Sequence, residues 1–228
     1  MKKWLGIAVV LIAGAVVLVR VKWLNSPMRE IERSKAAVAA AKSWHSRAVR
    51  HIPGLPTDTY EKDTLCPAFQ HTTASSTSPD GTPIVREWIS YSGRGYAFVD
   101  GHWTSSGGTQ AQTNANAAGT VASVMDCATG PIGADITSLP YDAMLSGSVE
   151  RGDERQVEGD SCRDYDVTFS TPHDPEEKEF QFTICINEAD HLPRQTRRRP
   201  PGYSQENVST FTKWNAMKEP ELPEEIPN

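Results

Sequence analysis

The sequence lacks the short motifs that mark common catalytic and cofactor sites. It contains no GxSxG nucleophile turn, no phosphate-binding loop, no GxGxxG, no HExxH and no EF-hand loop. A Ser/His/Asp triad is a spatial arrangement that sequence does not exclude, but nothing here favours one. We therefore expect no catalytic residue and no cofactor. The histidines are scattered among polar and turn positions: His45, His51, His71, His102, His173 and His191.

Positive charge is also scarce. Lys and Arg total 23 against 29 Asp and Glu, which leaves a net charge of -6. This balance disfavours nucleic acid as a partner, because phosphate contacts need clustered Lys and Arg. The one basic cluster, Arg194 with Arg197–Arg199, falls on an expected strand. We interpret it as a solvated sheet face or edge, with attraction to anionic lipid headgroups as the alternative.

Cysteine is rare, and its spacing argues against a zinc site. The four cysteines form no CxxC pair, and no histidine lies at zinc-ligand spacing from any of them: Cys66, Cys127, Cys162 and Cys185. We therefore expect no metal. An even number of cysteines behind a hydrophobic leader favours disulfides formed in an oxidising compartment.

The only long hydrophobic run lies at the N-terminus. Trp4–Val19 is unbroken and has basic residues at both ends. It is shorter than the roughly 20 residues that span a hydrocarbon core, but flanking Lys and Arg can reach the interface. No small-x-small cleavage site follows it, because Ala13-Gly14-Ala15 lies inside the run. We predict that residues 1–24 are an uncleaved single-pass membrane anchor, with the body on the extracytoplasmic, periplasmic side. A cleaved signal peptide is the alternative.

Residues 25–218 are expected to form a single α+β domain. Ser26-Pro27 is typical of a helix start, and Met28–Arg50 is rich in helix-forming residues. Leu139–Leu145 is a candidate short helix. The acidic, proline-rich residues 219–228 are expected to be an extended or disordered tail. Alternating segments separated by turn signals predict antiparallel strands: Asp63–Thr73, Thr82–Tyr91, Gly95–Asp100, Ser148–Glu158, Cys162–Ser170, Glu179–Asn187, Leu192–Arg199 and Asn207–Trp214.

The most informative stretch is an expected hairpin around Pro172–Pro175. Apolar residues share one face of its two strands: Tyr165, Val167, Phe169, Phe180, Phe182, Ile184 and Ile186. The opposite face carries Cys162 and Cys185. Placing these cysteines opposite each other sets every apolar residue against another: Tyr165 against Phe182, and Val167 against Phe180. This register predicts a Cys162–Cys185 disulfide, and elimination then pairs Cys66 with Cys127.

The chain resembles the periplasmic lipoprotein-carrier superfamily, with its LolA-like, RseB-like and mycobacterial lipid-carrier branches. The resemblance covers roughly Met28–Pro223. It rests on the leader, the first helix and loose motifs along the strands: Tyr96–Trp103, Val157-Glu158-Gly159 with Cys162 and Tyr165, Phe182–Ile186, Leu192-Pro193, and Phe211 with Trp214-Asn215. It implies a curved antiparallel sheet, a half-barrel, with helices packed on its concave face around an interior for acyl chains. The four cysteines and the retained anchor depart from a simple soluble carrier.

We predict a non-enzymatic, membrane-anchored domain that holds a lipid or an acylated, lipoprotein-like ligand in an apolar cleft. The expected helix presents mostly alanine to the sheet, so it fills little volume there. An envelope sensor or interaction domain of the same fold, with a filled core, is the alternative, and an unrecognised hydrolase is less favoured. The expected cleft lining is Tyr165, Val167, Phe169, Phe180, Phe182, Ile184, Trp44 and Trp88.

Overall fold

The computed structural model describes residues 26–67, 69–78, 80–92, 94–105, 141–170, 179–199, 205–224 and 226. The predicted anchor and Cys127 lie outside these residues. Within the described ranges, no helix combines the length and the apolar character needed to cross a membrane.

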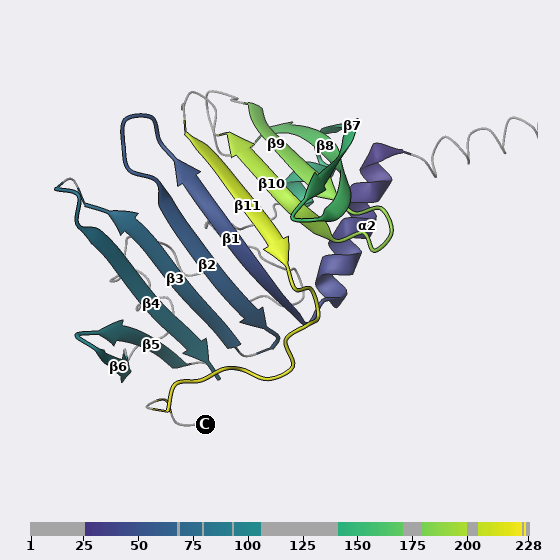
Figure 1. Ribbon diagram of the computed structural model, residues 1–228. Coiled ribbons are helices and arrows are strands. Elements are labelled where there is room, and N and C mark those ends of the chain that lie inside the picture. Colours follow the sequence, from purple (N-terminus) through teal and green to yellow (C-terminus); the bar gives the residue numbers. More distant parts are fainter. Residues whose placement is uncertain are drawn as a thin grey trace, which may run out of the picture.

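One large, unclosed antiparallel sheet dominates the molecule (Figure 1). Its 11 strands run in the order β6-β5-β4-β3-β2-β1-β11-β10-β9-β8-β7. The chain therefore folds as two meanders, and β1 meets β11 where they join. The strands are β1 (Ser43–His51), β2 (Asp58–Leu65), β3 (Phe69–Thr77), β4 (Pro83–Tyr91), β5 (Arg94–Val99), β6 (His102–Ser105), β7 (Ser148–Val157), β8 (Asp160–Ser170), β9 (Glu179–Ile186), β10 (Pro193–Arg199) and β11 (Glu206–Thr212).

The first helix is shorter than predicted. Helix α2 (Pro27–Ala40) begins as expected, with Ser26 at the N-cap position and proline in its first turn. It ends at Ala40 rather than Arg50, and the following residues form β1. Alternate side chains of β1 are buried, namely Trp44, Ser46 and Ala48. Because β1 pairs with β2 on one side and β11 on the other, these tertiary contacts outweigh the helix propensity of the segment.

The first half of the sheet contains two more differences from the predicted strands. The single strand expected over Asp63–Thr73 is a hairpin, because β2 ends at Leu65 and β3 starts at Phe69. Pro67 lies in the connection, where its missing N–H and fixed φ interrupt strand pairing. Strand β6 was not predicted. The short helix was predicted correctly and is α4 (Tyr141–Leu145).

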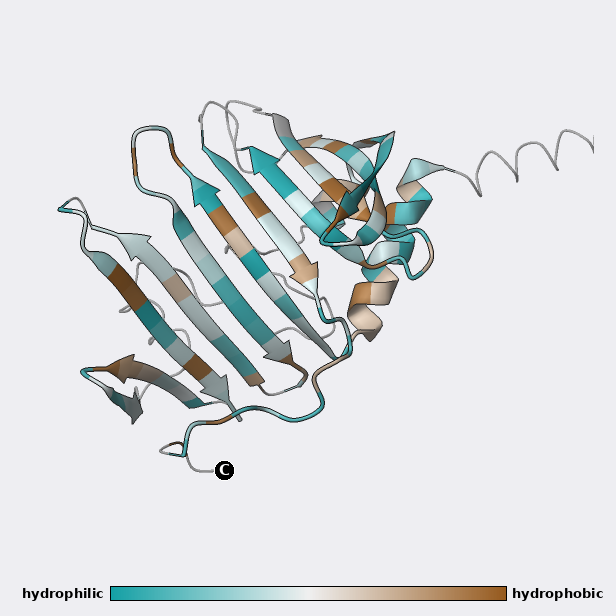
Figure 2. Ribbon diagram, viewed as in Figure 1, coloured by the Kyte–Doolittle hydropathy of each residue, from teal (hydrophilic) through white to brown (hydrophobic). Residues whose placement is uncertain are grey.

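The two faces of the sheet differ in what covers them. Helices α2 and α4 pack on one side of the sheet, which we call the helix face, and the opposite side is the outer face. Brown and teal segments alternate along the strands in Figure 2, as expected where successive side chains point to opposite faces. The main core lies between α2, α4 and the second meander. A second apolar cluster lies on the outer face of β3–β5. The structure therefore confirms a large curved sheet with a helix on one face.

The predicted hairpin of β8 and β9 is present, with its faces as expected and its register shifted by two residues. Asp164, not Cys162, lies opposite Cys185, and Val167 lies opposite Phe182. The Cys162–Cys185 disulfide is nevertheless formed, across a diagonal pair with a Cα–Cα distance of 5.4 Å. Such a shift preserves every face because side chains alternate with a period of two. Cys66 is also disulfide-bonded.

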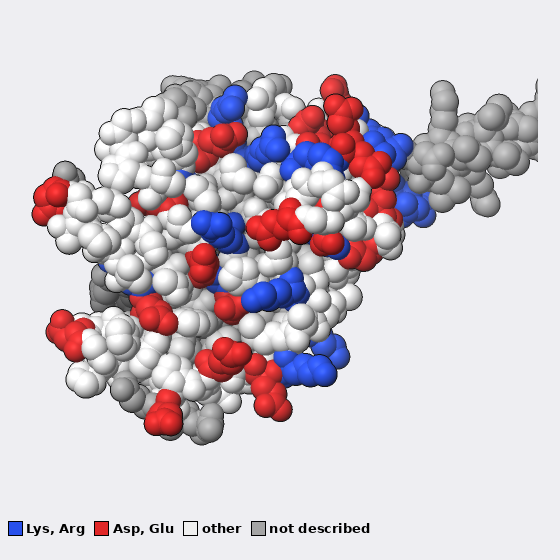
Figure 3. Space-filling view, in the orientation of Figure 1, with Lys and Arg blue, Asp and Glu red and all other residues white. Residues whose placement is uncertain are grey.

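The arginine cluster lies on β10, an inner strand between β9 and β11. The prediction of a solvated face or edge is wrong for Arg194, which is 7% exposed. Its guanidinium lies 2.7 Å from Asp160 Oδ2 and 2.6 Å from Asp190 Oδ2. Burial lowers the pKa of Arg198, while Arg197 is exposed. On the face shown in Figure 3, acidic side chains interleave with basic ones, so that face presents no extended basic patch.

Candidate binding site

Most of the predicted cleft lining forms the wall of the main core. Six of the eight residues come from the facing strands β8 and β9, at alternate positions that belong to the helix face. Their described side chains are almost fully buried: Tyr165 2%, Val167 1%, Phe169 7%, Phe182 3%, Ile184 0% and, from β1, Trp44 3%. Phe180 lies opposite Phe169 in the register, and its side chain is outside the described ones. The wall is therefore continuous and apolar.

The helix over this wall presents small or polar side chains. Ile31 and Val38 are its only large aliphatic members in the core cluster, beside Ala37 and the neighbouring Ala41. Ser34 is fully buried, and its hydroxyl lies 2.7 Å from the Tyr141 hydroxyl of α4. Burial of Tyr141 raises the pKa of that phenol. The cover is therefore weakly apolar for a helix that closes a core.

Polar contacts hold the edges of α2. Glu30, 6% exposed, lies 2.5 Å from His191 Nδ1 in the loop before β10. Lys35 Nζ donates to Asp142 Oδ1 of α4 at 2.6 Å. An exposed ion pair such as the second contributes little, typically less than about 1 kcal/mol. Helix α2 thus rests on the wall through few large apolar contacts, with polar groups along its edges.

A charged network closes one end of the wall. The Tyr165 hydroxyl donates to Glu188 Oε1 at 2.7 Å, and Arg151 and Arg163 bind the same oxygen at 2.7 and 3.2 Å. Burial raises the pKa of Tyr165, and the bond to Glu188 raises it further. Burial alone would raise the pKa of Glu188, but hydrogen bonds from Tyr165 and Arg151 lower it. Tyr165 therefore stays a neutral donor at the rim of an apolar surface.

Trp88 does not belong to this wall. It lies on β4, and six strands (β3, β2, β1, β11, β10 and β9) separate β4 from β8. Sequence reasoning grouped it with the other aromatics by residue type alone. Trp44 joins the wall from a strand rather than from the helix on which it was predicted.

The helix face turns polar beyond β1. Its residues on β1–β4 are buried and mostly polar: Ser46, Lys62, Thr64, Gln70, Thr72 and Ser90. Three buried groups here have no hydrogen-bond partner among the described residues, namely Trp44 Nε1, Thr64 Oγ1 and Thr72 Oγ1. Such groups are costly unless paired. One face of a single sheet thus carries an apolar wall beside a polar one, with Trp44 at the junction.

The outer face contains a separate pocket of about 230 Å³. His45, Asp63 and His71 lie directly opposite one another on β1, β2 and β3 and form its floor. The segment after β11 contributes the other side, including Lys213 and Glu221. His45 Nδ1 lies 2.8 Å from Asp63 Oδ1, and His71 Nε2 lies 2.6 Å from Glu87 Oε1. No prediction from sequence singled out this pocket.

The Asp63 carboxylate on the outer face should make the free energy of unfolding depend on pH in the acid range. The hydrogen bond from His45 lowers the pKa of Asp63, and Lys213 and His71 lower it further. A lowered folded-state pKa stabilises the fold above the ordinary value of 3.8, and this contribution is lost as pH falls through the folded pKa. We expect Asp63→Asn to lower the free energy of unfolding at pH 7 by less than about 1 kcal/mol, since the pair is part-exposed.

Urea unfolding between pH 7 and pH 3 measures this effect. The difference between wild type and Asp63→Asn should be constant down to about pH 4 and shrink below it. Asp153→Asn, at an exposed position of β7, is the control and should leave the curve unchanged. A difference that persists undiminished at pH 3 would contradict the role of the charge.

The fold is similar to that of known proteins, although no family model and no curated protein matches the sequence. The crystal structure of LprF from Mycobacterium bovis superposes with a TM-score of 0.58 and 12% identity, covering 88% of this chain and 97% of LprF. A Pseudomonas aeruginosa MucA/MucB complex gives 0.45 and 14%, covering 83% of this chain but 56% of the matched chain. A LolA superfamily protein from Nitrosomonas europaea gives 0.28 and 9%, covering 87% and 95%. At 12% identity, the match to LprF shows a likeness of fold.

Proposed function

We propose that this protein is a membrane-anchored, extracytoplasmic binding domain that holds a lipid or an acylated ligand between the second meander and helix α2. The observation that carries the proposal is the wall of Tyr165, Val167, Phe169, Phe182 and Ile184 beneath a helix with few large side chains. Aromatic and aliphatic walls with few polar groups are typical of apolar ligand sites. The protein binds its ligand and does not transform it.

The neighbouring polar wall supports an amphiphilic ligand. An acyl chain fits against the β8–β9 wall, while the buried polar groups of β2 and β3 offer partners to a headgroup. Thr64 and Thr72 lie on the same face as Trp44, on β2 next to β1 and on β3 beyond it. Both kinds of surface are therefore available on one face.

Displacement of α2 is the simplest way to admit a ligand, because the wall is buried beneath it. The helix is held by two large aliphatic side chains and by polar contacts at its edges, which water can replace. Moving a helix of this kind exposes less apolar surface than moving a leucine-rich one. The proposed ligand offsets the cost of exposing this apolar surface, because it covers the wall in place of the helix.

The location of the protein is part of the proposal. Stable structural disulfides form in oxidising compartments, and the Cys162–Cys185 bond supports an extracytoplasmic body. The N-terminal apolar run supports an anchor rather than a diffusing carrier. N-terminal sequencing of the mature protein tests this, because a start near Ser26 would make the domain a secreted one.

Two alanines of α2 provide a matched test of ligand binding. Ala37 packs against the core cluster, whereas its neighbour Ala36 is exposed. We expect wild type to take up a fluorescent fatty acid saturably, and Ala37→Leu to weaken this uptake at least fivefold because leucine fills space above the wall. Ala36→Leu adds the same side chain to solvent and should bind like wild type. A titration followed by probe fluorescence measures all three affinities.

Two outcomes contradict the proposal. Wild type that shows no saturable uptake has a filled core, which fits an interaction domain of the same fold. Equal weakening in both variants would place the probe away from the helix–sheet interface.

A further inference from the structure

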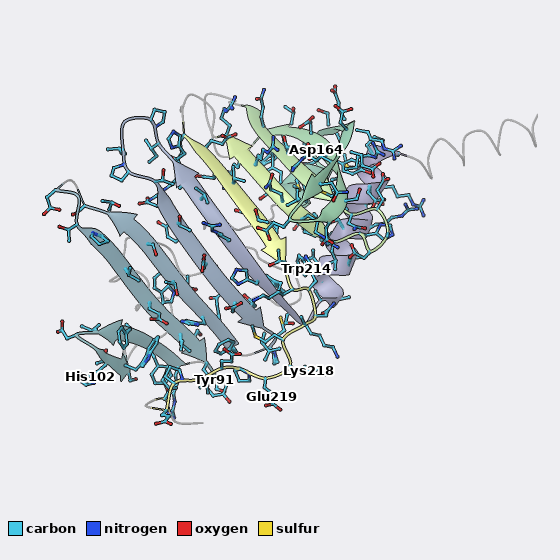
Figure 4. The ribbon with its side chains drawn as sticks, viewed as in Figure 1. Tyr91, His102, Asp164, Trp214, Lys218 and Glu219 are labelled. Carbon is cyan, nitrogen blue, oxygen red and sulfur yellow. A yellow bond between two sulfur atoms is a disulfide. The ribbon has the colours of Figure 1, made fainter. Side chains whose placement is uncertain are left out.

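The segment that follows β11 runs along one end of the strands of the first meander (Figures 1 and 4). Its first residues are fixed to the sheet by hydrogen bonds. Asn215 N donates to Ser43 O at 2.8 Å, Lys42 N donates to Asn215 Oδ1 at 2.7 Å, and Met217 N donates to Ser43 Oγ at 3.1 Å. Figure 4 shows Lys218 and Glu219 as the segment continues past the strand ends toward Tyr91.

Apolar anchors hold the remainder of the segment. Ile226 is 3% exposed and belongs to the outer-face cluster, and Leu222 and Met217 pack against the same cluster. The groove beneath them consists of side chains from β2–β6: Leu65, Phe69, Ile89, Tyr91, Tyr96 and Trp103. Among the described residues of 218–226, the backbone–backbone hydrogen bond is a local one, which Ile226 N donates to Pro223 O at 3.0 Å. Burial of side chains, rather than strand pairing, therefore positions this stretch.

The chemistry of the segment is that of a recognition peptide. Pro220 and Pro223 favour extended backbone that loses little entropy on docking. Glu221 lines the same pocket as His45, His71 and Lys213. Leu222 and Ile226 supply two aliphatic anchors four residues apart. Within the tail that was predicted to be extended or disordered, Ile226 is buried against the outer-face cluster.

We propose that this outer-face groove is a peptide-docking surface, occupied here by residues 217–224 and 226 of the same chain. The partner that fits it is a protein presenting an extended, acidic, proline-containing peptide with aliphatic anchors four residues apart. Such a peptide displaces the chain's own segment, which acts as a built-in competitor. The groove lies on the face opposite the proposed lipid site, so the two interactions are independent.

Releasing the segment from the groove tests this proposal. The variant Leu222→Asp/Ile226→Asp keeps the full chain but removes both anchors. A fluorescent synthetic peptide with the sequence of residues 215–228 is then added, and its anisotropy is measured. We expect saturable binding to the variant and at least tenfold weaker binding to wild type, because a tethered competitor acts at an effective concentration of about millimolar.

A charge-matched control separates anchoring from electrostatics. Lys218→Glu changes the net charge by the same two units at an exposed position and should bind the peptide as weakly as wild type. A peptide with aspartate in place of both anchors should not bind the released variant. Circular dichroism confirms folding, and if the double variant fails to fold, Ile226→Ser replaces it with an expected intermediate affinity.

Three results would overturn the proposal. The first is that the peptide does not bind a folded Leu222→Asp/Ile226→Asp variant. The second is that the peptide binds wild type and this variant with equal affinity. The third is that the peptide without anchors binds the variant as tightly as the original peptide does. A concentration-dependent wild-type dimer that disappears in the released variant would instead assign the segment to the groove of a second copy.

Discussion

Replacing Phe182 with alanine is expected to lower the free energy of unfolding by about 3–5 kcal/mol, as is typical for truncation of a fully buried phenylalanine. Phe182 is 3% exposed and lies in the middle of the wall formed by β8 and β9. The loss combines the transfer of the missing ring with the space left behind, which α2 fills poorly because its own side chains are small. Urea denaturation followed by circular dichroism measures it.

Phe98→Ala is the matched control, since it removes the same ring from a position that is 43% exposed on β5. Its expected cost is about 0.5 kcal/mol, as for most surface substitutions. Similar losses in the two variants would show that the wall is not a close-packed core.

A saturating acyl probe should stabilise wild type by mass action. At a probe concentration of a hundred times its dissociation constant, the free energy of unfolding should rise by about 2.7 kcal/mol.

Removing the Cys162–Cys185 disulfide, by replacing both cysteines with alanine, is expected to lower the free energy of unfolding by about 3 kcal/mol on the chain-entropy model. The bond closes a loop with a sequence separation of 23 residues. Both sulfurs lie in a small buried cluster with Val157, away from the main core. The expected loss of stability therefore comes mainly from the greater conformational entropy of the unfolded chain, rather than from a cavity left in the main core.

Denaturation of the double variant under oxidising conditions is the appropriate measurement. Chemical reduction of wild type is a poorer test because Cys66 is disulfide-bonded as well. The bound acyl probe serves as a local control, since the apolar wall faces the opposite side of these strands. Unchanged stability in the double variant would contradict the expectation. Loss of probe binding at unchanged stability would show that the bond shapes the wall instead.

The second meander was largely predictable from the sequence. Its strands alternate cleanly between apolar and polar residues, so the faces of β8 and β9 followed from a period of two. The register did not follow, because we placed Cys162 directly opposite Cys185, whereas the protein joins a diagonal pair. A pattern with period two determines which residues share a face but leaves a shift by two open.

The first half was harder to predict for two physical reasons. Ala41–Arg50 has the composition of a helix, and only its pairing with β2 and the distant β11 makes it a strand. The outer-face groove depends on Ile226, an aliphatic residue in an acidic, proline-rich segment that composition marks as disordered. The spacing of Leu222 and Ile226 is compatible with two anchors, but only the structure shows the surface against which they pack, which includes Phe69 and Tyr96.

The junction of β1 with β11 has a consequence for how the chain acquires its fold. Strand β1 pairs locally with β2, but its other edge pairs with β11, as His45 does with Thr212. Contacts this distant in sequence slow folding, because a long loop must close before they form. Since the N-terminal part of a chain emerges first, the first meander waits with an unpaired edge until the last strand arrives. An unpaired edge invites pairing with other chains, so this protein depends on rapid completion, or on protection of β1, while it is being made.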